Sequence, residues 1–184
     1  MLTLPTAYFA PISWYQQLHR AGTAEIEQWE HFPKQTLRNR CTIATTDGRQ
    51  TLTVPVEKHL PHCPTRDIRI SDHGAWRHLH WNALLSAYRK TPFFDYYADD
   101  LHPFFERKWT FLVDFNEAIR QTVCELLDIS PTVSLTRRYE GVTEQPTFLP
   151  KPYYQLFSAK HGFQPNLSIL DLLFEMGPEA VLWL

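Results

Sequence analysis

The sequence has few cysteines, few glycines and no long hydrophobic run. Its three cysteines, Cys41, Cys63 and Cys124, are too few and odd in number for a disulfide framework, which favours a reducing, cytoplasmic location. No stretch approaches the roughly 20 apolar residues that a membrane-spanning helix needs. The opening residues, interrupted by Pro5 and Pro11, lack the pattern of a signal peptide.

A strong excess of charge of either sign is also missing. The chain carries 18 Lys and Arg against 20 Asp and Glu, a net charge of −2, so no overall positive field exists to hold nucleic acid or an acidic membrane. Composition alone therefore indicates a globular domain and points to no particular partner. What the sequence does have is apolar content, 43% hydrophobic and 14% aromatic over 184 residues, which suits a single domain spanning 1–184 with a real core.

The first half of the chain has mainly strand-like patterns. Candidate strands at residues 2–9 and 24–30 flank a helix expected over 12–21. The clearest local signal is a β-hairpin near residues 41–56, where two β-rich runs flank an Asp-Gly turn. This half is therefore expected to be β-rich.

The second half has mainly helical patterns. Apolar spacing from Trp76 to Tyr88 and from Phe111 to Leu127 predicts two amphipathic helices, and Ser168 can cap a third. Weaker patterns favour short strands at residues 68–71, 133–139 and 153–158. Strands come early and helices late, so we predict an α+β fold with the helical C-terminal half packed on the β-rich half. The side chains expected in its core are Trp76, Leu84, Phe111, Phe115, Ile119, Leu126, Leu170 and Leu173.

The sharpest polar cluster precedes the hairpin and holds Lys34, Arg38, Asn39 and Arg40. Because Arg38 and Arg40 are two residues apart, a β conformation places both guanidinium groups on one face and Asn39 on the other. Two such groups, with Lys34 nearby, suit a phosphate, a pyrophosphate or a carboxylate. The alternative is an edge-strand charge cluster balanced by the acidic residues Glu25, Glu27 and Glu30.

Two side chains are candidates for proton transfer or nucleophilic attack. His80 lies on the apolar stripe of its helix, and it is either a general base, because imidazole titrates near neutral pH, or a hydrogen-bonded structural residue. Cys41 follows Arg40, whose charge can lower the thiol pKa and activate a nucleophile, although a buried strand cysteine is the commoner outcome.

Three further residues have the chemistry of metal ligands. His59, His62 and Cys63 lie close together in a loop that prolines interrupt, but a structural zinc site needs a fourth ligand and none is nearby in the sequence. We therefore expect no metal here. No P-loop or dinucleotide-binding motif occurs either, which leaves the identity of any cofactor unknown.

Five segments, in order along nearly the whole chain, resemble the WbqC-like family. They are LPTAYFAPISWY, EHFPKQTLRNRCTI, LTVPV, HWNALLSAYRKTPFFDYY and SILDLLFEMGPEA. Asn39-Arg40 matches an Asn-Arg pair of the family, Lys34 a recurrent lysine, and His80 and Tyr88 a His and a Tyr eight residues apart.

The chain also departs from this family in two places. Thr3-Leu4 stands before Pro5, where many members have His-Gln, so any role of that His or Gln is missing. The segment between Tyr139 and Tyr153 is short, which can remove a loop that contributes to a site.

The resemblance implies a bacterial enzyme of cell-surface polysaccharide (O-antigen-type) biosynthesis, an acyl- or aminoacyl-group transferase acting on an amino sugar or nucleotide sugar. His80 would then deprotonate the acceptor amine, and Cys41 is the candidate for a thioester. The partner that the resemblance implies is thus a small-molecule substrate, and the residues expected to bind it are Lys34, Arg38, Asn39, Arg40 and Tyr88. The alternatives are a non-catalytic module that binds a nucleotide sugar or a partner protein, and a structural accessory subunit without a small ligand.

Overall fold

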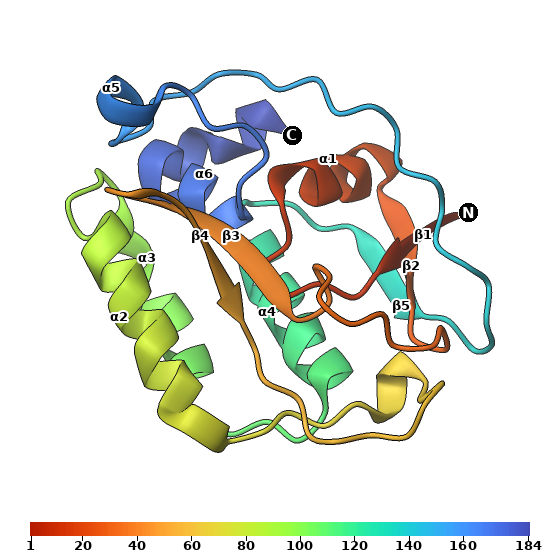
Figure 1. Cartoon of the computed structure of the whole chain (residues 1–184). Helices are drawn as coiled ribbons and strands as arrows, with labels where there is room; N and C mark the ends of the chain where they lie inside the picture. The colour runs from red at the N-terminus through yellow and green to blue at the C-terminus, as the bar shows by residue number, and fades with distance from the viewer.

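The computed structural model describes residues 1–184 and has an α+β fold, as predicted (Figure 1). A three-stranded sheet in the order β1-β2-β5 combines β1 (Leu2–Pro5), β2 (Thr23–Glu27) and β5 (Thr132–Leu135). All its strand pairs are parallel. The helix α1 (Ile12–Ala21) connects β1 to β2, as parallel neighbours require, and ends at Gly22, which adopts a φ of 66°.

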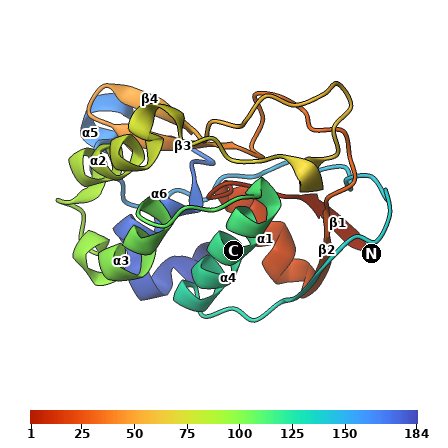
Figure 2. The ribbon, with the colours of Figure 1, turned by 90° about the horizontal axis from the view of Figure 1, so that it is seen from below.

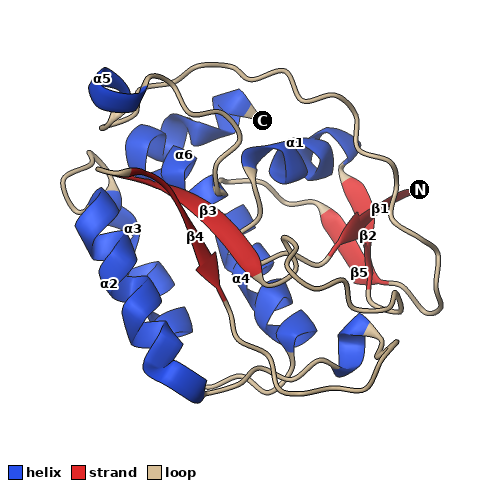
Figure 3. Ribbon diagram, viewed as in Figure 1, coloured by secondary structure: helices blue, strands red, loops and turns tan.

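The predicted hairpin forms a separate two-stranded antiparallel sheet, β3 (Arg40–Thr45) and β4 (Gly48–Thr53). Thr45 pairs with Gly48 across the turn, and Gly48 has a φ of 108°, which favours glycine. The hairpin crosses the molecule beside the helices (Figure 3), and β3 contacts both α2 (Trp76–Tyr88) and α6 (Ile169–Met176).

The remaining helices lie mainly in the second half, as expected. They are α3 (Phe94–Leu101), α4 (Leu112–Leu126) and α5 (Ser158–His161), with 3-10 turns at Thr65–Asp67, His73–Ala75, His102–Phe105 and Gly177–Trp183. Figure 2 shows the hairpin and the long loop after it on one side of the molecule, with α3, α4 and α6 on the other. None of the helices is both long and apolar enough to cross a membrane.

Some predicted strands are wrong or too long. Residues 153–158 form no strand, because Tyr153 and Gln155 are buried and bond to the carboxylate of Asp171 instead of to a neighbouring strand. Residues 68–71 make only isolated bridges. The strands expected at 2–9 and 133–139 end early, at Pro5 and Leu135.

The core is one cluster that draws side chains from both halves of the chain. Most of the predicted core residues are buried in it, namely Trp76, Leu84, Phe115, Ile119, Leu170 and Leu173. Phe111 and Leu126 are only half-buried, because each lies at an end of α4. The ring of Phe111 is covered by the Arg69 guanidinium, 4.9 Å from its centroid.

Candidate ligand-binding site

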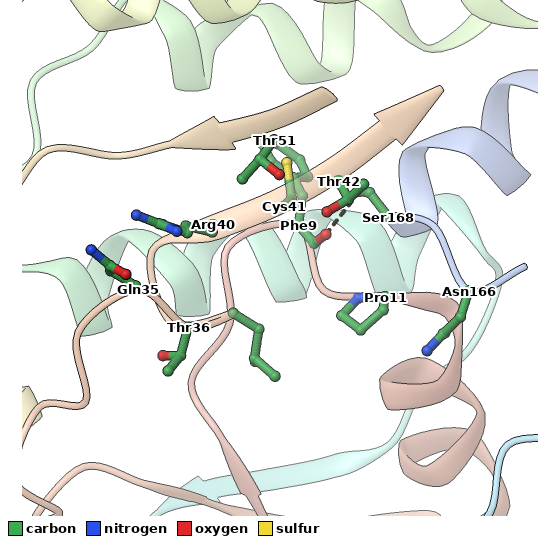
Figure 4. A pocket seen from close by; sticks show the side chains of 11 residues that line it. Phe9, Pro11, Gln35, Thr36, Arg40, Cys41, Thr42, Thr51, Asn166 and Ser168 are labelled. Carbon is green, nitrogen blue, oxygen red and sulfur yellow. Dashed lines mark hydrogen bonds between the residues drawn. The ribbon is translucent and has the colours of Figure 1, made fainter. Parts of the chain in front are cut away.

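A polar cavity of about 370 Å³ opens between the loop after β1, the segment before β3, the hairpin and the segment before α6. We call it the Arg40 cavity. Figure 4 shows its lining residues, which are Phe9, Pro11, Gln35, Thr36, Leu37, Arg40, Cys41, Thr42, Thr51, Asn166 and Ser168. Of the site residues predicted from sequence, this cavity contains Arg40 and Cys41.

Arg40 is the only charged side chain that lines this cavity. It is the first residue of β3, where it pairs with Thr53, and its side chain forms no salt bridge. Its Nε is buried without a hydrogen-bond partner. A guanidinium group with free N–H donors and no competing carboxylate is suited to an anionic ligand.

Hydroxyl and amide groups form much of the remaining wall (Figure 4). The Ser168 hydroxyl donates to the carbonyl of Phe9 at 2.8 Å, while its backbone N–H donates to the carbonyl of Thr42 at 2.8 Å. The next residue, Ile169, donates to the carbonyl of Ala10 at 2.9 Å. These bonds tie the β1 loop, the hairpin and the start of α6 together, so the cavity has fixed walls.

Three non-glycine residues of the wall have left-handed backbone conformations, Phe9 with a φ of 40°, Gln35 with 61° and Asn166 with 54°. This conformation is costly for a bulky residue such as Phe9 and persists where surrounding contacts enforce it. The Phe9 ring is fully buried and stacks on Phe105 at a centroid distance of 5.9 Å. Asn166 Oδ1 accepts a 2.9 Å hydrogen bond from the Ser13 N–H at the start of α1. Such strain concentrates at functional sites.

The predicted pair of guanidinium groups on one face does not form. Residues 34–39 are turns rather than an extended strand, and the carbonyl of Arg38 accepts a 2.8 Å hydrogen bond from Asn116 Nδ2. The Arg38 side chain instead forms a bidentate pair with Glu30, Nε to Oε1 at 2.7 Å and Nη2 to Oε2 at 3.0 Å. Lys34 is exposed to solvent. Arg38 is therefore balanced by an acidic residue, as the alternative interpretation of this cluster predicted, whereas Arg40 is not.

Asn39 and Tyr88 are buried and engaged in the scaffold. Asn39 Nδ2 donates to the carbonyl of Val54 at 3.0 Å and joins the ends of the hairpin. The Tyr88 hydroxyl accepts from the N–H of Ala44 at 3.1 Å and donates to Asp171 Oδ1 at 2.8 Å. These hydrogen bonds give both side chains a structural role, and neither side chain lines the Arg40 cavity.

His80 lies in the core rather than on the wall of the Arg40 cavity. Its Nδ1 is 2.9 Å from the Tyr8 hydroxyl, and its ring packs edge-on against Trp76 at 5.1 Å. Burial lowers the pKa of His80 to about 4, so the imidazole is neutral at physiological pH. This geometry favours the structural alternative over the general base.

Cys41 lines the cavity, but its environment does not activate the thiol. The side chain is buried, and burial raises the pKa of the Cys41 thiol far above its usual range. The thiolate, which is the nucleophilic form, is therefore scarce at neutral pH. The adjacent Arg40 does not lower the pKa as the sequence suggested.

The potential metal ligands of the 59–63 loop, His59, His62 and Cys63, do not meet at a common point. His62 Nδ1 lies 3.2 Å from His31 Nδ1, whereas His59 Nδ1 lies 3.1 Å from the carbonyl of Leu60. Cys63 Sγ faces the carbonyl of Pro64 at 3.6 Å. No group of three or more His, Cys, Asp or Glu side chains is arranged to hold a metal ion.

Several wall residues were not predicted from the sequence. The sequence predicts Ser168 only as a helix cap, which it is, since its Oγ accepts from the N–H of Leu170 at 3.3 Å. Asn166, Thr42 and Thr51 have no distinguishing local pattern. Their place in a site follows from the meeting of the hairpin with the segment before α6, more than 110 residues apart in the chain.

Comparison with known proteins identifies the family to which the chain belongs. The chain belongs to the WbqC-like protein family, whose profile matches residues 6–149, a range that contains Arg40 and Cys41 but not Asn166 or Ser168. The chain is similar to the uncharacterised protein Rv1507c of Mycobacterium tuberculosis, with 30% identity over 192 residues and 81% of each chain covered. No solved structure matches the chain.

Proposed function

We propose that this protein binds a phosphorylated sugar, of the nucleotide-sugar class, in the Arg40 cavity. The observation that carries the proposal is the unpaired Arg40 guanidinium in a cavity without a carboxylate. Guanidinium groups bind phosphate oxygens through parallel charge-assisted hydrogen bonds. The hydroxyl and amide groups of Thr51, Ser168 and Asn166 supply neutral partners for sugar hydroxyls.

The dimensions of the cavity agree with a ligand of this size. A volume of about 370 Å³ lies near the lower end of the range of small-molecule sites. It suits a sugar phosphate, or the sugar-diphosphate part of a nucleotide sugar with the nucleoside extending outward.

Our second proposal is transfer of an acyl or aminoacyl group onto a bound amino sugar, in cell-surface polysaccharide biosynthesis in the cytoplasm. It is supported by the family membership and by a polar cavity that can hold a phosphorylated sugar. The raised thiol pKa favours direct attack of the substrate amine on the acyl donor over a Cys41 thioester. In direct attack the amine forms the new C–N bond, the donor's leaving group departs with its electron pair, and the amine loses a proton. The role of the chain would be to orient the two reactants.

Titration calorimetry with UDP-N-acetylglucosamine, UDP and inorganic phosphate tests the binding proposal. Arg40→Lys keeps the charge but loses the bidentate geometry, so we expect binding to weaken about tenfold or more, and further in Arg40→Ala. Arg137→Ala, which removes an exposed arginine, is the matched control and should bind as the unmodified protein does. Equal affinities in all variants, or no binding of any of the three probes, would overturn the proposal.

The transfer proposal has its own readout. The protein is incubated with acetyl-coenzyme A and UDP-glucosamine, and mass spectrometry follows the N-acylated sugar. Direct attack predicts product formation by Cys41→Ser at a rate similar to that of the unmodified protein. Loss of product only in Cys41→Ser would instead establish the thioester route, and no product with either protein argues for a binding function alone.

A further inference from the structure

A second and larger cavity, of about 730 Å³, lies against the same segment before β3. Its lining residues are Trp29, Glu30, His31, Pro33, Arg38 and Tyr139, and we call it the Trp29 groove. Pro33 and Arg38 face this groove, while the intervening residues 35–37 line the Arg40 cavity. Nothing in the proposed function uses it.

Glu30 and Arg38, two lining residues of the Trp29 groove, carry opposite charges. Glu30 and Arg38 form the bidentate pair described above, and their side chains are only 14% and 13% exposed. Each still has hydrogen-bonding capacity after pairing, since a carboxylate accepts at about four positions and a guanidinium group has five N–H donors. Adjacent acceptors and donors whose charges are paired suit neighbouring hydroxyl groups rather than an anion.

Trp29 supplies a fixed aromatic wall. Its indole Nε1 donates to the carbonyl of Thr136 at 2.9 Å, and its backbone N–H donates to Glu27 Oε1 at 2.7 Å. The Arg66 guanidinium lies 4.3 Å from the centroid of the indole. The ring orientation is therefore determined before any ligand arrives.

Tyr139 supplies a second aromatic group, 67% exposed. Its loop is held by Glu27, whose Oε2 accepts from the N–H groups of Glu140 at 2.8 Å and Gly141 at 2.9 Å. One fully buried carboxylate thus fixes the backbone beside both Trp29 and Tyr139. An exposed aromatic ring on an anchored loop offers apolar area at low entropic cost.

We propose that the Trp29 groove binds a neutral pyranose ring. The C–H face of the sugar packs on the face of the Trp29 indole opposite Arg66, with Tyr139 at the rim. Glu30 accepts hydrogen bonds from neighbouring sugar hydroxyls, and Arg38 donates to them. The groove thereby differs from the Arg40 cavity, whose unpaired charge selects an anion.

Ligand-observed saturation-transfer NMR tests this assignment. The probes are methyl α-glucopyranoside, methyl β-galactopyranoside and N-acetylglucosamine, each without a phosphate group. We expect saturation of the ring protons of at least one probe, and a weakening of binding by about threefold or more in Tyr139→Ala. Tyr154→Ala removes another exposed tyrosine, 58% exposed, and should leave the signal unchanged. Trp29→Phe, checked by a thermal melt, tests the stacking surface itself and should also weaken binding.

Several results overturn the proposal. These are an absence of saturation transfer to all three glycosides, a signal that survives both Tyr139→Ala and Trp29→Phe, and a signal that disappears in Arg40→Ala instead. Tyr139-dependent binding of adenosine without binding of any glycoside would assign the groove to a nucleobase and also overturn it. Arg40→Ala affects only the anion site, so failure of the phosphorylated-sugar proposal and failure of this one are distinguishable.

Discussion

The hydroxyl of Tyr88 and the carboxylate of Asp171, 83 positions apart in the chain, form a 2.8 Å hydrogen bond in the interior. Asp171 also accepts from the Tyr153 hydroxyl at 2.5 Å and from Gln155 Nε2 at 3.0 Å. Burial raises the pKa of this carboxyl, and these donors oppose the shift. The network joins β3, α2 and α6, which together support one side of the Arg40 cavity.

Tyr88→Phe should destabilise the protein without altering ligand affinity. The change removes a donor to Asp171 and an acceptor for the Ala44 N–H, both buried, so we expect a loss of about 1–3 kcal/mol in the free energy of unfolding. Urea titration measures it, with Tyr96→Phe, at an exposed tyrosine, as the control. Normal stability combined with lost binding of UDP-N-acetylglucosamine would return Tyr88 to a substrate role.

Leu84→Ala should cost on the order of 2–5 kcal/mol of unfolding free energy, because it leaves a cavity at a fully buried position of α2. Leu79→Ala on the same helix removes the same atoms from a side chain that is 60% exposed, and should cost far less. Chemical denaturation of both variants measures the difference. Similar values would mean that the helix face has been misassigned.

Truncation of Arg38 should lower stability, whereas truncation of Arg40 should weaken ligand binding. Arg38→Ala leaves the largely buried Glu30 carboxylate without its partner and should lower the unfolding free energy by about 1–3 kcal/mol. Arg40→Ala breaks no ion pair and should leave the melting temperature nearly unchanged while weakening phosphate binding. Thermal melts distinguish them. A large loss of stability in Arg40→Ala would show that Arg40 holds the fold.

Glu175 should make stability depend on pH. Burial raises the pKa of its carboxyl to about 7, and the neighbouring Asp171 adds to the shift. Because the folded pKa lies above the unfolded value of about 4.3, the stabilising contribution is complete below that value and is lost as pH rises through about 7. Glu175→Gln should therefore show a smaller fall in melting temperature between pH 5 and 8, whereas the exposed Glu179→Gln should retain the full fall. If the melting temperature falls equally between pH 5 and 8 in the unmodified protein and in both variants, this assignment is contradicted.

The three thiols should react at different rates. Burial raises the thiol pKa of all three cysteines, but Cys41 and Cys124 are buried whereas Cys63 is half-buried and so more accessible to a reagent. Iodoacetamide labelling of the folded protein, followed by peptide mass spectrometry, should modify Cys63 roughly tenfold faster or more. Fast labelling of Cys41 that is blocked by a phosphorylated sugar would revive a nucleophilic role for this residue.

The elements that the sequence predicted well are those with a strong local pattern. The helix before β2 and the amphipathic helices α2 and α4 follow from apolar spacing, and the hairpin follows from its turn residues. The parallel sheet did not follow, because β5 joins β2 from more than 100 residues away, where Ile26 pairs with Leu135. No local signal encodes such a pairing.

The candidate site was predicted only in part, for a related reason. Arg40 was identified because its charge and its position at the start of the hairpin are local properties. The position of Arg38 was wrong because the chain turns where an extended conformation was expected, and in this turn the Arg38 carbonyl accepts a hydrogen bond from the distant Asn116 in α4. His80 carries the right chemistry for a base, yet only tertiary packing determines that it is buried and neutral.

The segment before β3 forms a partition with a cavity on each side. Its carbonyl groups at Leu37 and Arg38 are anchored by the Tyr8 N–H at 3.0 Å and by Asn116 at 2.8 Å, whereas Lys34 and Gln35 are exposed. Any displacement of the exposed part widens one compartment and narrows the other. If a ligand in one compartment displaces this shared wall, linkage requires that the two ligands change each other's affinity by the same factor.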